Sequence, residues 1–166
     1  MRRNTLVLGA LSLVLAASTA LAQDKPNFSG SWTRVVDPNA PAPTGRGGRG
    51  GGRGGLGAAA TLAQDDKTLT ITRTTQAGET KTVYNLDGSD SKNTMMMGGN
   101  QMEQVSKAMW EVSKLVVTTN YEFNGNPITT TQSFTLDASG QLVVEATAPG
   151  RGGGAPVTTT VTYKKG

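Results

Sequence analysis

The chain has 166 residues, of which 22 are glycine, and a formal net charge of +4, a length that suits one ordinary domain. It contains no histidine and no cysteine. This absence excludes a Ser-His-Asp triad, a cysteine nucleophile and nearly every zinc or haem ligand set, and it leaves no disulfide to support the fold.

Residues 1–22 have the pattern of a secretory signal peptide. Two arginines supply a positive start, residues 6–17 form an apolar core, and residues 20–22 form a small-residue cleavage site. The apolar run is short for a membrane span, so we expect cleavage rather than retention in the membrane. Both arginines leave with the signal, and the net charge falls to +2. We therefore expect an exported protein, periplasmic or extracellular, with one mature domain at residues 23–166.

The first strand is expected at residues 28–36, where Phe28, Trp32, Arg34 and Val36 share one face. After it the composition changes, and residues 45–57 hold nine glycines and three arginines. Such a segment cannot bury enough apolar surface to offset the entropy of ordering it. Residues 37–65 are therefore predicted to form a flexible insert, in which residues 58–64 add a short helical turn.

Arg-Gly-Gly repeats like those of the insert also occur in segments that bind nucleic acids, where arginine supplies charge and stacking. Here the chain is expected to be exported, its mature charge is small, and no aromatic residues alternate with the arginines. We therefore expect no nucleic-acid partner and interpret the repeat as a flexible loop.

Three more strands are predicted at residues 67–75, 81–86 and 105–112. In each, side chains of one kind recur at every second position, as on a half-buried strand. The residues predicted to share a face are Leu69, Ile71 and Arg73 in the first strand, Tyr84 and Leu86 in the second, and Ala108, Trp110 and Val112 in the third.

Residues 93–101 are expected to be irregular and are rich in methionine. The thioethers of Met95, Met96, Met97 and Met102 suit Cu(I), but no histidine or cysteine strengthens a site. Methionine also fills gaps against aromatic surfaces. We interpret the cluster as packing residues and expect no metal and no cofactor.

The second half of the chain has the clearest strand pattern. Strands are predicted at residues 115–123, 128–136, 142–147 and 157–163, with turns at residues 124–127 and 137–140. Pro127 is expected to end pairing. Apolar residues recur at two-residue spacing, whereas a helix would need spacings of three and four. About eight short strands with short connections indicate a closed antiparallel barrel or a sandwich.

Two stretches resemble the lipocalins and fatty-acid-binding proteins, the calycin group. Residues 28–32 are similar to the Phe-x-Gly-x-Trp opening of that group, and residues 157–165, after the hairpin at 140–144, are similar to the last strand of the fatty-acid-binding branch. The overall likeness is to small exported lipocalin-like proteins of bacteria. The resemblance implies one antiparallel meander closed into a lipocalin-like barrel. That branch holds a carboxylate with Arg-x-Tyr; here Tyr163 matches, but Val161 stands at the arginine position.

Along the predicted strands, aromatic side chains fall on the same face as aliphatic neighbours, as in a packed core. Polar residues also fall on that face. A solid core would leave those polar groups unsatisfied, whereas a wet or ligand-filled interior would satisfy them. We therefore expect a non-enzymatic carrier of a small apolar or amphipathic ligand. The candidate ligand-binding residues are Trp32, Arg34, Arg73, Trp110, Tyr121, Gln132, Phe134 and Tyr163.

Two other classes of function remain open. A structural or interaction module of the cell envelope would have a solid interior and no ligand. An enzyme with a pair of carboxylates is disfavoured, because most acidic residues fall in turns or on strand faces predicted to be exposed.

Overall fold

The computed structural model describes residues 25–36, 55–75, 78–97, 99–150 and 153–166. The expected export signal and the glycine- and arginine-rich part of the insert at residues 37–54 lie outside these ranges. Only the end of the insert, from residue 55 onward, can therefore be compared with its prediction.

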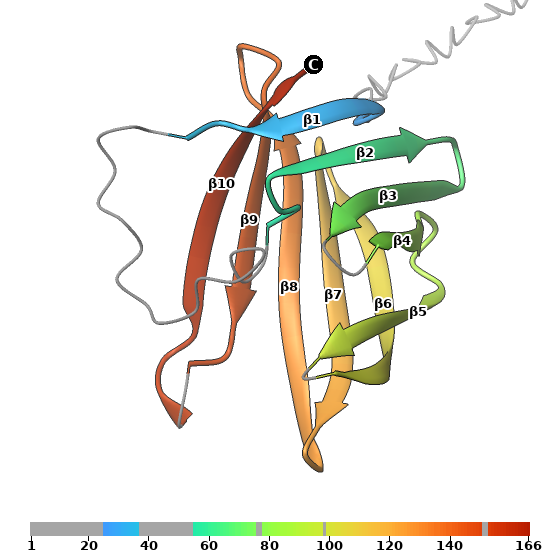
Figure 1. Cartoon of the computed structure of the whole chain (residues 1–166). Coiled ribbons are helices and arrows are strands. Elements are labelled where there is room, and N and C mark those ends of the chain that lie inside the picture. Colours follow the sequence, from blue (N-terminus) through green and yellow to red (C-terminus); the bar gives the residue numbers. More distant parts are fainter. Residues whose placement is uncertain (1–24, 37–54, 76–77, 98, 151–152) are drawn as a thin grey trace, which may run out of the picture.

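The described chain forms one antiparallel sheet of ten strands that curls into a nearly closed barrel (Figure 1). Neighbours in sequence pair along the whole meander except for β4 and β5, and the last strand returns to pair with the first. The strands are β1 (Gly30–Arg34), β2 (Ala59–Gln64), β3 (Thr68–Thr75), β4 (Gly78–Asn85), β5 (Asp90–Met97), β6 (Asn100–Glu111), β7 (Lys114–Phe123), β8 (Asn126–Leu136), β9 (Leu142–Ala148) and β10 (Val157–Lys165).

The expected all-β meander is confirmed, but the structure has ten strands rather than about eight. Residues 58–64 were predicted to form a helical turn, but residues 59–64 form β2, where Ala60 and Leu62 alternate with exposed neighbours. Residues 93–101 were predicted to be irregular, but residues 93–97 belong to β5 and residues 100–101 to β6. Ser91 and Asn93 occupy inner positions of β5, so an apolar alternation does not mark that strand.

Two smaller predictions about strand ends are also wrong. Pro127 does not end pairing but lies in β8 opposite Glu122. Val112 does not share the inner face of Ala108 and Trp110, because it follows the end of β6 in a turn with a φ of 60°. Its side chain is 63% exposed.

The register identifies the inner face of each strand, because directly opposed residues of antiparallel strands point to the same side of a sheet. Leu115 lies opposite Phe134, and Leu69 lies opposite Tyr84, which agrees with their burial. The largest fully buried side chains are Trp32, Tyr163, Phe28, Phe134, Leu62, Leu69, Leu115, Leu142, Val117 and Val144. Trp32 and Tyr163 therefore share one enclosed core, as the strand periodicity predicts.

Burial along each inner row changes from one end of the barrel to the other. On β7 the inner side chains are buried from Leu115 to Thr119, and then half-exposed at Tyr121 and exposed at Phe123. The same gradient occurs on β3, β4 and β9, and on β8 and β10 as far as Phe134 and Tyr163, beyond which the terminal inner residues Leu136 and Lys165 are exposed. We call the buried side the packed end and the other side the open end.

The packed end is plugged by the segment that precedes β1. The Phe28 ring stacks on Trp110, with ring centroids 5.8 Å apart, and its centroid lies 6.2 Å from that of Phe134. The indole nitrogen of Trp32 donates a hydrogen bond of 2.8 Å to the carbonyl oxygen of Phe28. Apolar contacts and satisfied polar groups thus hold the plug in place.

Candidate functional site

The inner wall toward the open end is polar and half-exposed, in contrast to the apolar packed end. The half-exposed residues at inner positions of this wall are Arg73, Thr80, Asn93, Met95, Met102, Gln104, Tyr121, Ile128, Thr130, Gln132 and Thr159. Their partial exposure means that solvent reaches this inner row of side chains. This region is the candidate site.

The charges that point inward are all positive. In the ten described strands, the inner positions carry Arg34, Arg73 and Lys165 but no aspartate or glutamate. Glu79, Glu103 and Glu122, for example, lie at positions opposite outer-facing residues. An interior with this distribution of charge favours a negative or hydrogen-bond-accepting group.

Arg73 is the unusual residue of this wall. Its Nε is buried, and it is the one buried side-chain nitrogen or oxygen of the described residues without a hydrogen-bond partner. No described carboxylate pairs with its guanidinium, since the ion pairs of this part of the chain join Lys107 to Asp90 and Lys114 to Glu111. Buried donors in native proteins almost always have a partner, so this donor marks a position where an acceptor fits.

Tyr163 links the arginines to the packed end. Arg34 lies directly opposite Tyr163 in the β1–β10 register. Burial raises the pKa of the Tyr163 hydroxyl, and the hydrogen bond from the Leu56 amide, together with the charges of Arg34 and Arg73, offsets part of that rise. Burial also raises the pKa of Tyr84, and the positive charge of Arg73 lowers it in part. Both arginines therefore act on the same inner region.

The structure divides the eight predicted site residues into two groups. Trp32, Phe134 and Tyr163 are buried in the packed core, and Trp110 packs against that core. Arg73, Tyr121 and Gln132 lie on the half-exposed inner wall, and the exposed Arg34 stands at the end of β1 on the same face. Only this second group lies where the interior is accessible.

The methionine cluster is split by the sheet. Met95 and Met102 lie opposite each other on the inner face of β5 and β6, whereas Met96 is on the outer face and 65% exposed. The two inner thioethers line the accessible part of the interior, where they provide adaptable apolar contact.

A belt of buried hydroxyl groups lies on the inner face, and sequence reasoning identified only Thr119 of it, as a polar residue among inward-facing apolar ones. It consists of Thr82, Ser91, Ser106 and Thr119, which lie on β4, β5, β6 and β7. The hydroxyls of Ser106 and Thr119 are hydrogen-bonded across β6 and β7 at 2.8 Å. The belt separates the apolar packed end from the polar open end. The run of four polar residues at 91–94 is the signal that could have indicated its β5 member, Ser91.

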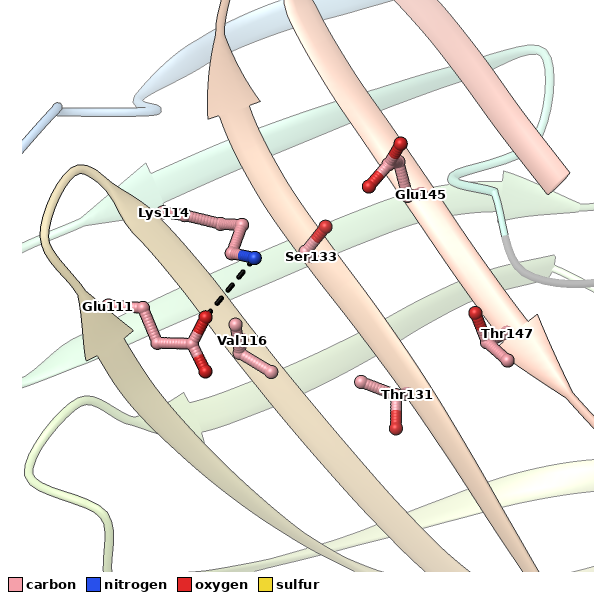
Figure 2. A pocket seen from close by; sticks show the side chains of 7 residues that line it. All are labelled: Glu111, Lys114, Val116, Thr131, Ser133, Glu145 and Thr147. Carbon is pink, nitrogen blue, oxygen red and sulfur yellow. Dashed lines mark ion pairs between the residues drawn. The ribbon is translucent and has the colours of Figure 1, made fainter. Parts of the chain in front are cut away.

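A hollow of about 300 Å³ lies on the outer surface of the barrel (Figure 2). Its wall consists of Glu111, Lys114, Val116, Thr131, Ser133, Glu145 and Thr147, which come from the region of β6–β9. Glu111 and Lys114 neutralise each other with an ion pair of 3.1 Å. None of the predicted site residues lies in this hollow, so the outer surface is not our candidate site.

Among the residues that the structure describes, no three histidine, cysteine, aspartate or glutamate residues gather closely enough to hold a metal ion. Within the same ranges there is no helix long and apolar enough to cross a bilayer.

In comparisons with known proteins, no family model matches the chain, and no curated protein matches it significantly. The barrel itself, all-antiparallel, ten-stranded and nearly closed, is compatible with a calycin-like architecture.

Proposed function

We propose that this chain is an exported binding protein that holds a small amphipathic ligand inside the open end of a lipocalin-like barrel, without catalysing a reaction. The buried, unpartnered Nε of Arg73 is the observation that carries the proposal. An anionic or strongly accepting group of the ligand would take the hydrogen bonds that the protein leaves unmade there.

The surroundings of Arg73 support an amphipathic rather than a fully polar ligand. Tyr121, Ile128, Met95 and Met102 offer apolar contact on the same inner wall. Arg34 and Gln132 lie at inner positions and would help to orient the polar group. The aromatic residues of the packed end would form the floor of this site rather than its walls.

Native mass spectrometry of the protein purified from its own host tests the proposal directly. A co-purifying small molecule would support it and identify the ligand class. Protein that is consistently empty would instead favour a structural or interaction module of the cell envelope, and the solid interior of the packed end fits that alternative.

Binding of a defined probe, the apolar anion anilinonaphthalene sulfonate, tests the role of Arg73. Arg73→Leu should weaken the affinity about tenfold or more, because a charge-assisted hydrogen bond is lost, and Gln132→Leu should weaken it less. Lys107→Leu makes the same change of charge on the outer face, where Lys107 pairs with Asp90, and should leave the affinity unchanged. Equal affinities for Arg73→Leu and Lys107→Leu would remove Arg73 from the site.

A further inference from the structure

The wall of the barrel has one seam that is built differently from the rest. Nine neighbouring pairs of strands are joined by main-chain pairing, but β4 and β5 are not paired in this way. In the described part of the chain, four hydrogen bonds join them, and each of these involves a side chain of Asn85, Ser91 or Asn93.

Asn93 replaces the missing main-chain pairing with its carboxamide. Its Oδ1 accepts a hydrogen bond from the amide of Val83, and its Nδ2 donates one to the carbonyl oxygen of Val83, both at 2.8 Å. A carboxamide has the same donor and acceptor as a peptide group, so it can bind both main-chain groups of one residue. Next to it, the amide of Asn85 donates to Ser91 Oγ at 2.7 Å, and Asn85 Nδ2 donates to the carbonyl oxygen of Asp90 at 3.0 Å.

These contacts close only the part of the seam near the β4–β5 turn. No hydrogen bond of the described residues joins residues 78–81 of β4 to residues 94–97 of β5, and the two strands diverge away from their turn in Figure 1. Thr82 and Ser91, which belong to the buried hydroxyl belt, stand on the inner side of the closed part. Opening the seam would therefore connect solvent with a polar region of the interior.

We propose that the β4–β5 seam is a lateral gate in the barrel wall and that the Asn93 carboxamide is its latch. The seam opens when a few side-chain hydrogen bonds are exchanged for bonds to water, whereas opening at any other place breaks a continuous ladder of main-chain bonds. The proposal goes beyond the binding function, because the gate would admit small solutes whether or not the protein carries a ligand.

Asn93→Asp tests the latch with almost no change of shape. At neutral pH the carboxylate still accepts from the Val83 amide, but its second oxygen faces the Val83 carbonyl oxygen and cannot donate. At low pH the protonated carboxyl group regains a donor, so the seam should close again. The charged and titratable groups of the strands around position 93 are Asp90 and Lys92 on β5, Glu103, Lys107 and Glu111 on β6, Glu79, Lys81 and Tyr84 on β4, and Arg73 on β3.

A single buried thiol reports whether the gate is open. The chain has no cysteine, so Thr82→Cys introduces the only thiol, at a position that is 4% exposed behind the seam. Its reaction with 4,4′-dithiodipyridine, which also labels thiols in acidic solution, is followed in the full chain. The matched control is Asn126→Asp, which removes a side-chain hydrogen bond to the carbonyl oxygen of Asn124 in the β7–β8 hairpin, away from the seam.

At neutral pH, Asn93→Asp should raise the labelling rate at position 82 by about tenfold or more over the Asn126→Asp control. Below the pKa of the new carboxyl group the two rates should converge. The proposal is overturned if the rates are equal at neutral pH. It is also overturned if the acceleration persists unchanged in acid, since that result indicates a general loss of stability rather than an opened latch.

Discussion

The two ends of this barrel are built from the same strands but differ in what occupies the space between them. At the packed end, Phe28 and Trp110 stack and Phe134 adjoins them, while most inner positions are apolar and buried. At the open end the inner positions are largely polar and half-exposed, and Arg73 keeps a buried donor without a partner. The difference separates a filled end that stabilises the fold from an accessible end, where we propose that a ligand binds.

The largest effect should come from emptying the packed end. Phe134 is fully buried, and Phe134→Ala leaves a cavity that its neighbours cannot fill, so we expect a loss of about 3–5 kcal/mol in the free energy of unfolding. Tyr121→Ala, at a half-exposed position, should cost about half as much or less. Chemical denaturation measures both values, and similar losses would contradict the division into two ends.

A smaller effect is expected from one polar contact inside the packed end. The hydroxyl oxygen of Tyr163 accepts a hydrogen bond of 2.7 Å from the amide of Leu56. Tyr163→Phe leaves that buried amide without an acceptor, which should lower the free energy of unfolding by about 1–3 kcal/mol. Exchange of the Leu56 amide with deuterium should also accelerate. A variant as stable as the parent would show that the contact is not maintained in solution.

Alkaline pH should weaken the packed end gradually. Burial raises the pKa of Tyr84 and of Tyr163, so these tyrosines stay neutral when the unfolded chain ionises. Their contribution to the free energy of unfolding is complete below a pH of about 10. It declines as the pH rises further, by at most about 1.4 kcal/mol per pH unit for each tyrosine. Chemical denaturation at several pH values between 9 and 11 measures this decline. The free energy of unfolding should fall less with pH for Tyr84→Phe than for the parent.

The smallest effect is expected at the open end of β10. Thr159 is half-exposed at an inner position, so Thr159→Val should change the free energy of unfolding by no more than about 0.5 kcal/mol. The next inner residue, Val161, is 6% exposed, and Val161→Thr should cost about 1–3 kcal/mol because it buries a hydroxyl group. Equal responses at the two positions would indicate that the interior is uniform along this strand.

The sequence predicted the strands with apolar alternation and missed those without it. The inner faces of β7 and β9 follow the two-residue period, and alternating burial confirms those faces, whereas on β8 Phe134 is the one buried residue. β2 was missed because alanine-rich residues after a glycine-rich segment also suit a helical turn. β5 was missed because Ser91 and Asn93 make its inner row polar.

The candidate site was predicted only in part for a related reason. Arg73 and Gln132 were identified because they are polar residues on the otherwise apolar face of their strands. Alternation marks the whole inner face, so it could not distinguish the accessible Arg73 from Trp32 or Tyr163, which are buried in the core. Asn93 could not be identified at all, because its partner is the main chain of Val83 on a strand with which β5 does not pair.

By itself, the sequence determined that the chain forms antiparallel strands and which side of most strands is apolar, because alternation is a local property of a pleated backbone. Only the tertiary structure decided the number of strands, the partner of β1, the side-chain seam between β4 and β5, and which end of the interior is filled. These features depend on register between segments far apart in the chain, and on how closely opposite walls approach, so no local pattern encodes them.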